Sequence, residues 1–243
     1  MKSDCIISEI KKINKVFIGM SVISIFLSVF VLNLIYIYDN SYIAIKDTIL
    51  IDYIEVNNIL SGQVALFMPI LCIIATAFIW TVDFETGCIT YIFLGTTRKN
   101  WAIGKIIVSG IIVIFFYVAL GTGLTVVALL LGNDIMNTSY LKQLLLLVGA
   151  AIPVIIWILF TGIISITCKE FGKTVTVTLG VFLISYILEN YFTSMKGILP
   201  TSSIIYIWGY NDLSLLFKNI INVIFYTCIL ATVLVMKVKK REV

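Results

Sequence analysis

Long apolar runs are the feature that most restricts how this chain can fold. Six of them occur along the 243 residues, and most reach the roughly 20 residues that an α-helix needs to cross the hydrocarbon core of a bilayer. Inside lipid, every backbone N–H and C=O must be paired within the protein, so runs with helical patterning must be helices. The sequence predicts transmembrane helices at about residues 16–37, 60–82, 106–131, 143–166, 174–192 and 219–236.

Composition supports an all-α integral membrane protein. The chain is 60% hydrophobic and 12% charged, with a mean hydropathy of +1.10, whereas soluble domains are about 25% charged. The complete lack of histidine argues against histidine-dependent hydrolases, most zinc sites and histidine proton relays. Five scattered cysteines without a C-x-x-C motif predict small buried hydrophobes rather than disulfides or metal ligands. Without an internal repeat or linker, residues 1–243 are expected to form one transmembrane domain.

The distribution of lysine and arginine predicts the orientation. If the six runs cross the membrane, thirteen basic residues fall on one side and four on the other, and the richer side is expected to be cytoplasmic. Both termini are then cytoplasmic, which agrees with an even number of spans. The thirteen are Lys2, Lys11, Lys12, Lys15, Arg98, Lys99, Lys105, Lys169, Lys173, Lys237, Lys239, Lys240 and Arg241, and the four are Lys46, Lys142, Lys196 and Lys218.

The segment before the first run has a helical pattern of its own. Its isoleucines recur on one stripe, while Glu9, Lys12 and their charged neighbours fall mostly off that stripe. We expect an amphipathic helix over about residues 3–15 that lies in the membrane interface, with its lysines toward anionic headgroups. A frayed polar tail is the alternative. The stripe consists of Ile6, Ile7, Ile10 and Ile13.

The loop between the second and third runs, residues 83–105, has the most particular pattern. An acidic pair, Asp83 and Glu85, precedes Gly87, and an apolar run follows at 88–94. We expect that run to form a short helix across the membrane surface, with the glycines as its boundaries, where a partner protein could bind it. The apolar run contains Ile89, Tyr91, Ile92, Phe93 and Leu94, and the basic residues after it are Arg98, Lys99 and Lys105.

Acidic residues are the remaining candidates for chemistry. Glu189 lies near the outer end of the fifth run, and a carboxylate in a membrane span is a candidate functional residue, although a position near the end also lets it reach water. Asp83 and Glu85 could be a catalytic pair, but the loop offers no histidine or metal cluster. A docking or salt-bridge role is favoured for them, and no catalytic residue is predicted.

Other residues suggest where a cargo could pass or rule out nucleotide binding. Pro69 lies inside the second run and, like Pro153 in the fourth, predicts a kink. Tyr206 and Trp208 belong to the external segment 193–218, which could dip into the membrane or lie at headgroup depth. The predicted cargo pathway consists of Glu189, Pro69, Tyr206 and Trp208. The segment 172–174 (GKT) ends like a phosphate-binding loop, but Thr167 replaces the required glycine, so we expect only a tight turn.

The whole pattern resembles the ABC type-2 permease family, the membrane subunits of ATP-binding-cassette exporters. The resemblance covers nearly the whole chain: an amphipathic entry helix, six spans, both ends inside and the loop between spans two and three. The loop carries the family's acidic residue, turn, apolar run and Gly-Lys ending, and it departs from the family at Cys88 and at 95–97 (GTT). The matching positions are Glu85, Gly87, Leu94, Arg98, Gly104 and Lys105.

The resemblance implies that the chain has no catalysis or cofactor of its own. Separate cytoplasmic ATPase subunits, which hold ATP and Mg²⁺, would dock on residues 83–105 and on the entry helix, and their closure would tilt spans one, two and five. Two copies, or one copy with a related permease, would form a pathway in the cell membrane for an amphipathic cargo such as a peptide toxin or antimicrobial peptide. The implied docking residues are Asp83, Glu85, Gly87, Ile89, Tyr91, Ile92, Phe93, Leu94, Arg98, Lys99, Lys105, Glu9 and Lys12.

Two other functions are compatible with the same sequence. A six-span immunity or sequestration protein would bind a peptide without any motor. A secondary transporter would use ionisable residues or broken helices near the membrane midplane, which this chain does not clearly contain. No nucleic-acid partner is expected for an exporter or for either alternative.

Overall fold

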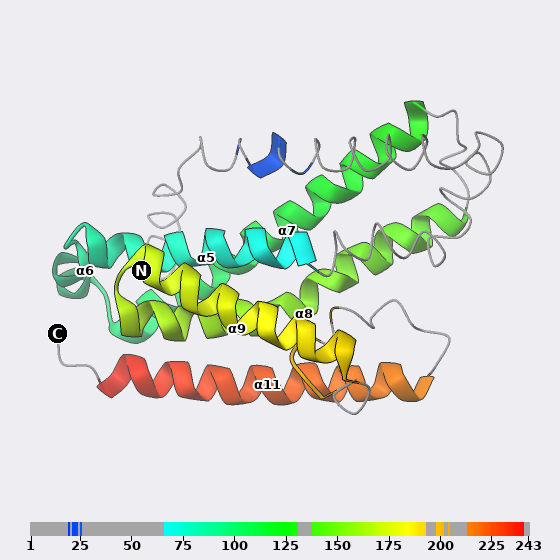
Figure 1. Ribbon diagram of the computed structural model, residues 1–243. Helices are drawn as coiled ribbons and strands as arrows, with labels where there is room; N and C mark the ends of the chain where they lie inside the picture. Colours follow the sequence, from blue (N-terminus) through cyan, green and yellow to red (C-terminus); the bar gives the residue numbers. More distant parts are fainter. Residues whose placement is uncertain are drawn as a thin grey trace.

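The computed structural model describes residues 19, 21–23, 25, 66–130, 138–192, 198–201, 204 and 213–240. Within these ranges the regular structure is entirely helical, and the long helices lie side by side along one common direction, with a short helix at one end (Figure 1). The helices are α5 (Met68–Glu85), α6 (Ile89–Gly95), α7 (Arg98–Leu130), α8 (Thr138–Cys168), α9 (Phe171–Tyr191) and α11 (Leu213–Lys240).

The prediction of an all-α fold is confirmed for the described part of the chain, and the length and composition of its helices suggest a membrane protein. Five helices are long and apolar enough to cross a bilayer, in Met68–Glu85, Arg98–Gly123, Gly149–Cys168, Phe171–Tyr191 and Phe217–Lys239. They coincide with the second to sixth predicted runs. The interface helix at 3–15 and most of the first run, 16–37, lie outside the described residues. A sixth span and the orientation of the termini therefore stay predictions.

Most of the helices extend beyond the apolar runs from which they were predicted. At 1.5 Å per residue, the 33 residues of α7 make a helix about 50 Å long, well over the hydrocarbon thickness of about 30 Å. The helix starts early because Thr97 caps it: its Oγ1 accepts the Asn100 N–H at 3.3 Å, and its carbonyl accepts the Trp101 N–H at 3.0 Å. The polar first turns of α7 thus stand at the end of the bundle, beside α6.

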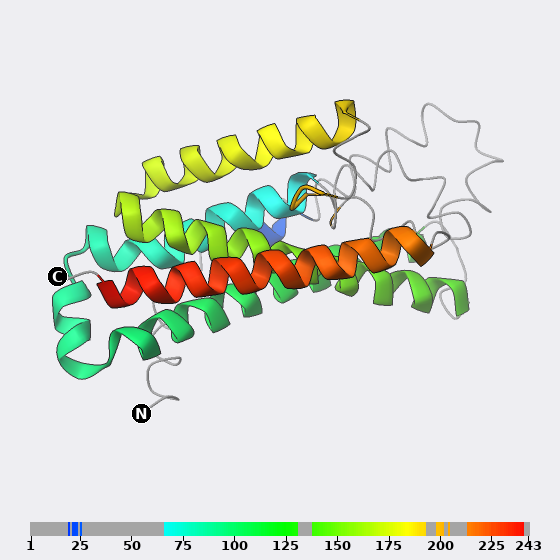
Figure 2. The same cartoon turned by 90° about the horizontal axis from the view of Figure 1, so that it is seen from below.

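Three helices form the interior of the bundle and two lie outside it. Most residues in the apolar windows of α5, α7 and α8 are buried, whereas only about a fifth of those in α9 and α11 are. Seen from below, α11 and α9 lie on different sides of the other helices (Figure 2). The packing is close where a small residue allows it: a Cβ on Gly162 of α8 would lie 3.0 Å from the Trp80 ring of α5. The largest fully buried side chains include Trp80, Trp101, Tyr117, Lys105, Phe116 and Phe182.

The structure bears on the prolines and the cysteines. Pro69 lies in the first turn of α5, directly after a π-helical turn at Leu66 and Phe67, and the residues before 66 lie outside the described part of the chain. Pro153 lies inside α8, as predicted for the fourth run, and the kinks expected at both prolines stay predictions. The cysteines in the described ranges are free thiols, but only Cys72 is buried, so the expectation of buried hydrophobes was wrong for the exposed Cys88 and Cys228.

Candidate functional site

The best-defined polar structure is the end of the bundle that carries α6. α5 ends where the Thr86 N–H bonds to the Val82 carbonyl at 3.0 Å and the Gly87 N–H bonds to the Phe84 carbonyl at 3.2 Å. Gly87 then adopts a φ of +67°, a left-handed conformation that costs glycine little. The chain turns there and enters α6 two residues later. The predicted short helix at 88–94, with Gly87 as its boundary, is confirmed with a shift of one residue.

A buried ion pair holds the base of this turn. The Lys105 Nζ of α7 lies 2.7 Å from the Asp83 Oδ2 of α5, and the two side chains are 0% and 2% exposed. Lys105 Nζ also donates to the Ile79 carbonyl at 2.5 Å, and Trp101 Nε1 donates to the same Asp83 oxygen at 2.9 Å. Charges taken out of water need such additional hydrogen bonds to offset the cost of their desolvation. The arrangement fixes α5 and α7 to each other as one hairpin.

Trp101 joins α6 to this hairpin. Its ring meets three aromatic rings edge to face: Trp80 at 5.5 Å and Phe84 at 5.9 Å on α5, and Phe93 at 5.7 Å on α6. This is the geometry that aromatic pairs prefer, and each pair adds about 0.5–1.5 kcal/mol beyond the burial of area. The Arg98 guanidinium lies 5.5 Å from the centre of the Phe93 ring. The short helix is therefore packed on a rigid aromatic base.

The opposite face of α6 is apolar and exposed. Ile89, Ile92 and Phe93 pack partly against the core, while Tyr91 is 76% and Leu94 is 82% exposed. Exposed apolar side chains contribute no hydrophobic stabilisation to the seven-residue α6. Two large ones side by side therefore indicate a contact outside the described helices. The pair suits either a membrane surface or a partner protein.

Glu85 connects this end to α9. Its Oε1 accepts the backbone N–H of Phe171, the first residue of α9, at 2.6 Å. Around this bond the Phe78 and Phe171 rings meet edge to face at 6.3 Å, and Lys169 Nζ lies 6.0 Å from the centre of the Phe84 ring. The expected tight turn between the fourth and fifth runs is thus confirmed at 169–170, and it is fastened to the end of α5.

The structure divides the predicted docking residues into two groups. Asp83 and Lys105 lie inside the hairpin and bind each other, which is the salt-bridge role that the sequence left open for Asp83, so they support the loop and do not present its surface. Asp83 and Glu85 do not form an acidic pair, because they bind different partners. The exposed group consists of Glu85, Gly87, Tyr91, Leu94 and Lys99, with Ile89, Ile92, Phe93 and Arg98 half-buried.

The other predicted site residues lie elsewhere. Glu9, Lys12, Tyr206 and Trp208 fall outside the described residues. Glu189 was expected near water, but it is fully buried within the bundle, at the end of α9 far from α6. Pro69 is buried at the start of α5. Because Tyr206 and Trp208 lie outside the described residues, the predicted cargo pathway stays a prediction.

Sequence reasoning missed Trp101. Its signal was a tryptophan within a polar stretch, one helical turn before Lys105, where the two side chains share a helix face. In the described ranges no three Cys, Asp or Glu side chains gather as metal ligands. This end of the molecule contains a buried ion pair and an exposed apolar surface.

Fold and site together define a helical membrane protein with a braced helix at one end of its bundle. No known protein family, curated protein or solved structure matches the chain.

Proposed function

We propose that the chain is the membrane subunit of an ATP-driven ABC exporter of the type-2 permease kind. The observation that carries this proposal is α6, a short helix that closes the end of two long apolar helices, braced by a buried ion pair and exposing Tyr91 and Leu94. A motor protein that moves membrane helices needs a rigid point of contact, because a flexible loop would absorb the motion.

The division of the site into inner and outer residues supports the same proposal. Tyr91 and Leu94 would enter a pocket of a cytoplasmic ATPase, with Glu85 and Lys99 on the polar rim, as hot-spot residues and their surroundings do in protein interfaces. Asp83, Lys105 and Trp101 would transmit the force to α5 and α7. ATP and Mg²⁺ belong to the ATPase, both termini lie in the cytoplasm, and two permeases form the pathway in the cell membrane.

The described spans fit an amphipathic or hydrophobic cargo. A peptide toxin or antimicrobial peptide is the proposed example. Each span has an apolar window with at most two charged residues. A small ion would need several ionisable groups along its path, whereas a cargo with its own apolar surface does not.

Co-purification tests the proposal. The detergent-solubilised chain should retain the ABC ATPase encoded beside its gene, and replacing Tyr91 and Leu94 together with serine should weaken that binding by about 2 kcal/mol or more, as loss of hot-spot side chains does. The matched control replaces Tyr191 and Phe192 with serine, since both are exposed apolar residues at the other end of α9. A well-folded chain that retains no ATPase would refute the exporter and favour sequestration without a motor.

A further inference from the structure

α9 turns a polar stripe toward the protein and an apolar face outward. Thr174, Thr178, Ser185 and Glu189 are buried, together with Phe182, and their spacing of three or four residues places them on one helix face. That face packs on α5 and α8, and the Phe182 ring meets the Trp157 ring of α8 at 5.0 Å. In membrane bundles polar side chains face the interior or a water-filled space.

Two hydroxyls of this stripe have no partner within the described part of the chain. They are the Oγ1 atoms of Thr174 and Thr178, and the indole N–H of Trp157 is likewise buried and unpaired. Several other threonines donate to their own helix: Thr161 of α8 and Thr176 on the outer face of α9 each donate to the carbonyl four residues earlier, at 2.6 and 2.9 Å, whereas Thr227 of α11 also lacks a partner among the described residues. A buried polar group without a partner is costly and calls for an explanation.

Polar contacts hold α9 at both ends. At its N-terminus the carboxylate comes from α5, because Glu85 accepts the Phe171 N–H, while the Glu170 at the cap position bonds instead to Lys173 at 2.5 Å. An anion at a helix N-terminus is favourable, since the first N–H groups lack partners in the helix.

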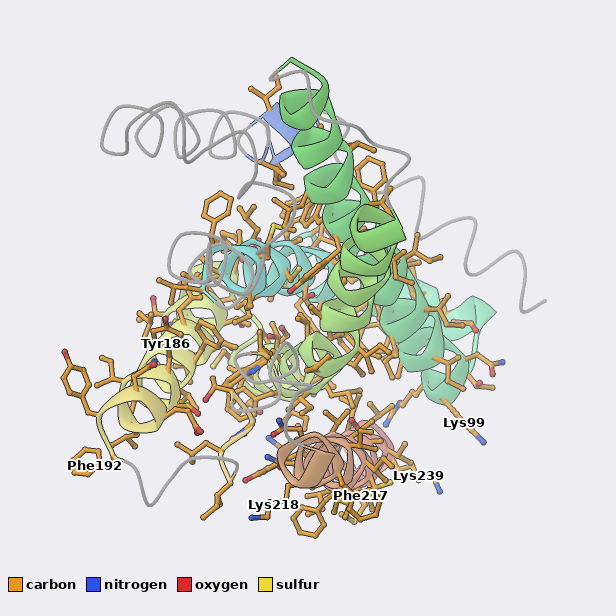
Figure 3. The ribbon with its side chains drawn as sticks, turned by 90° about the vertical axis from the view of Figure 1, so that its right-hand side faces the viewer. Lys99, Tyr186, Phe192, Phe217, Lys218 and Lys239 are labelled. Atoms are coloured by element: carbon orange, nitrogen blue, oxygen red, sulfur yellow. The ribbon has the colours of Figure 1, made fainter. Side chains whose placement is uncertain are left out.

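At the other end, Ser185 Oγ lies 3.0 Å from Thr201 Oγ1, and the turn that contains Thr201 is bound by α11. Asn222 of α11 donates to the carbonyls of Ile198 and Leu199, and the Tyr226 hydroxyl donates to that of Ile198. Seen along the helices, α9 and α11 both stand at the edge of the bundle, with Phe217 of α11 and Phe192 beyond α9 on its outer side (Figure 3).

We propose that Glu85 is a latch for α9, and that its release lets α9 part from α5 and α8 so that its inner stripe lines a path for the hydrogen-bonding groups of an amphipathic molecule. Thr174 and Thr178 would find in that state the polar partners that they lack in this one. The inference goes beyond the proposed exporter, because the latch and the stripe belong to this chain alone and need no ATPase.

Water access to Thr178 tests the latch. Thr178→Cys is introduced into the full chain with Cys5, Cys72, Cys88, Cys168 and Cys228 replaced by alanine, and the protein is reconstituted in vesicles that are permeabilised so that both faces are reached. The measurement is the rate of modification by a membrane-impermeant charged thiosulfonate. Glu85→Ala should raise this rate about three- to tenfold, the shift expected when one exposed charge-assisted hydrogen bond is lost. Glu85→Gln keeps an acceptor oxygen, so the modification rate at Thr178→Cys should stay near that of the parent protein.

Two controls separate the latch from general loosening. Glu170→Ala removes a neighbouring exposed carboxylate that does not bind Phe171, and it should leave the rate unchanged. Val181→Cys lies on the exposed face of α9, and its rate should not respond to Glu85→Ala. A Thr178→Cys rate that is equal in all Glu85 backgrounds, or a parallel rise at Val181→Cys, would overturn the proposal. If Thr178→Cys does not give a monodisperse protein, Thr174→Cys on the same stripe replaces it.

The outcome is independent of the proposed function. Latch-dependent labelling in a chain that binds no ATPase would leave the latch in place and refute the exporter. ATPase binding that depends on the 83–105 loop, without labelling that depends on Glu85, would support the exporter and refute the latch.

Discussion

α5 and α9 are similar in length and in hydropathy, yet they occupy different places in the bundle. In the most apolar window, 61% of the residues of α5 are buried against 22% of those of α9, and α11 buries still fewer, 17%. Apolar composition makes a helix compatible with lipid but does not decide whether its neighbours are lipids or other helices. Close packing and polar contacts with other helices together make that decision.

The two regions also treat their polar groups differently. The α5–α7 hairpin pairs its buried charges, since Asp83 binds both Lys105 and Trp101, although Trp80 Nε1 and Ser109 Oγ of the hairpin are buried without a partner among the described residues. α9 buries the hydroxyls of Thr174 and Thr178 without partners in the described part of the chain. A fully bonded charge cluster resists separation, whereas an interface with unsatisfied groups loses less when it opens. We infer that the hairpin is the rigid part and α9 the movable one.

The largest expected effect breaks the rigid part. Lys105→Met should lower the free energy of unfolding by about 3–5 kcal/mol, because it leaves the Asp83 carboxylate buried and unpaired. Thermal unfolding of the detergent-solubilised protein measures this. Asp83→Asn combined with Lys105→Met should recover much of the loss, since the uncompensated charge is gone. Lys237→Met on α11, where the lysine donates to Thr167 Oγ1, should change stability by only about 0.5 kcal/mol. Equal effects at the two lysines would contradict the special role of the buried ion pair in the rigid hairpin.

A pair of glycines gives an intermediate test. Gly162→Ala places a Cβ 3.0 Å from the Trp80 ring, and overpacking of this kind costs about 1–3 kcal/mol. Gly180→Ala on α9 meets nothing within 4 Å, so it should be neutral or should stabilise the helix by up to about 1 kcal/mol. The same unfolding measurement compares them. A loss at Gly180→Ala as large as that at Gly162→Ala would show that α9 is closely packed after all.

The smallest expected effect concerns the outer tie of α11. Tyr226→Phe removes the 3.1 Å hydrogen bond from the tyrosine hydroxyl to the Ile198 carbonyl and should cost about 0.5–1 kcal/mol. Phe225→Leu changes an exposed neighbour that makes no such bond and serves as the control. Hydrogen exchange of the 198–201 backbone should accelerate only in Tyr226→Phe. Unchanged exchange would mean that α11 does not hold this turn.

Much of the local structure could be predicted from the sequence, because its signals are local. The apolar runs gave the five described spans, and the glycine before an apolar run at 88–94 gave α6 and its boundary. Helix ends were less accurate, since Thr97 starts α7 well before its apolar part begins. The site was predicted only in outline. Asp83 and Lys105 were expected on a docking surface, since a charged residue beside an apolar run is usually exposed. No local sequence signal predicted that the two would form a buried ion pair.

The sequence by itself determined that this chain is a membrane protein made of helices, and it determined where the short helix α6 begins. Apolar length, the φ of Gly87 and the need to pair backbone groups in lipid act over a few residues and require no knowledge of neighbours. Only the tertiary structure decided that α5, α7 and α8 lie inside, that Asp83 and Lys105 bind each other, and that Glu85 reaches the first N–H of α9 across 86 residues of sequence. These features depend on which helix faces meet, and many pairings of apolar faces have similar energy until specific polar contacts select one.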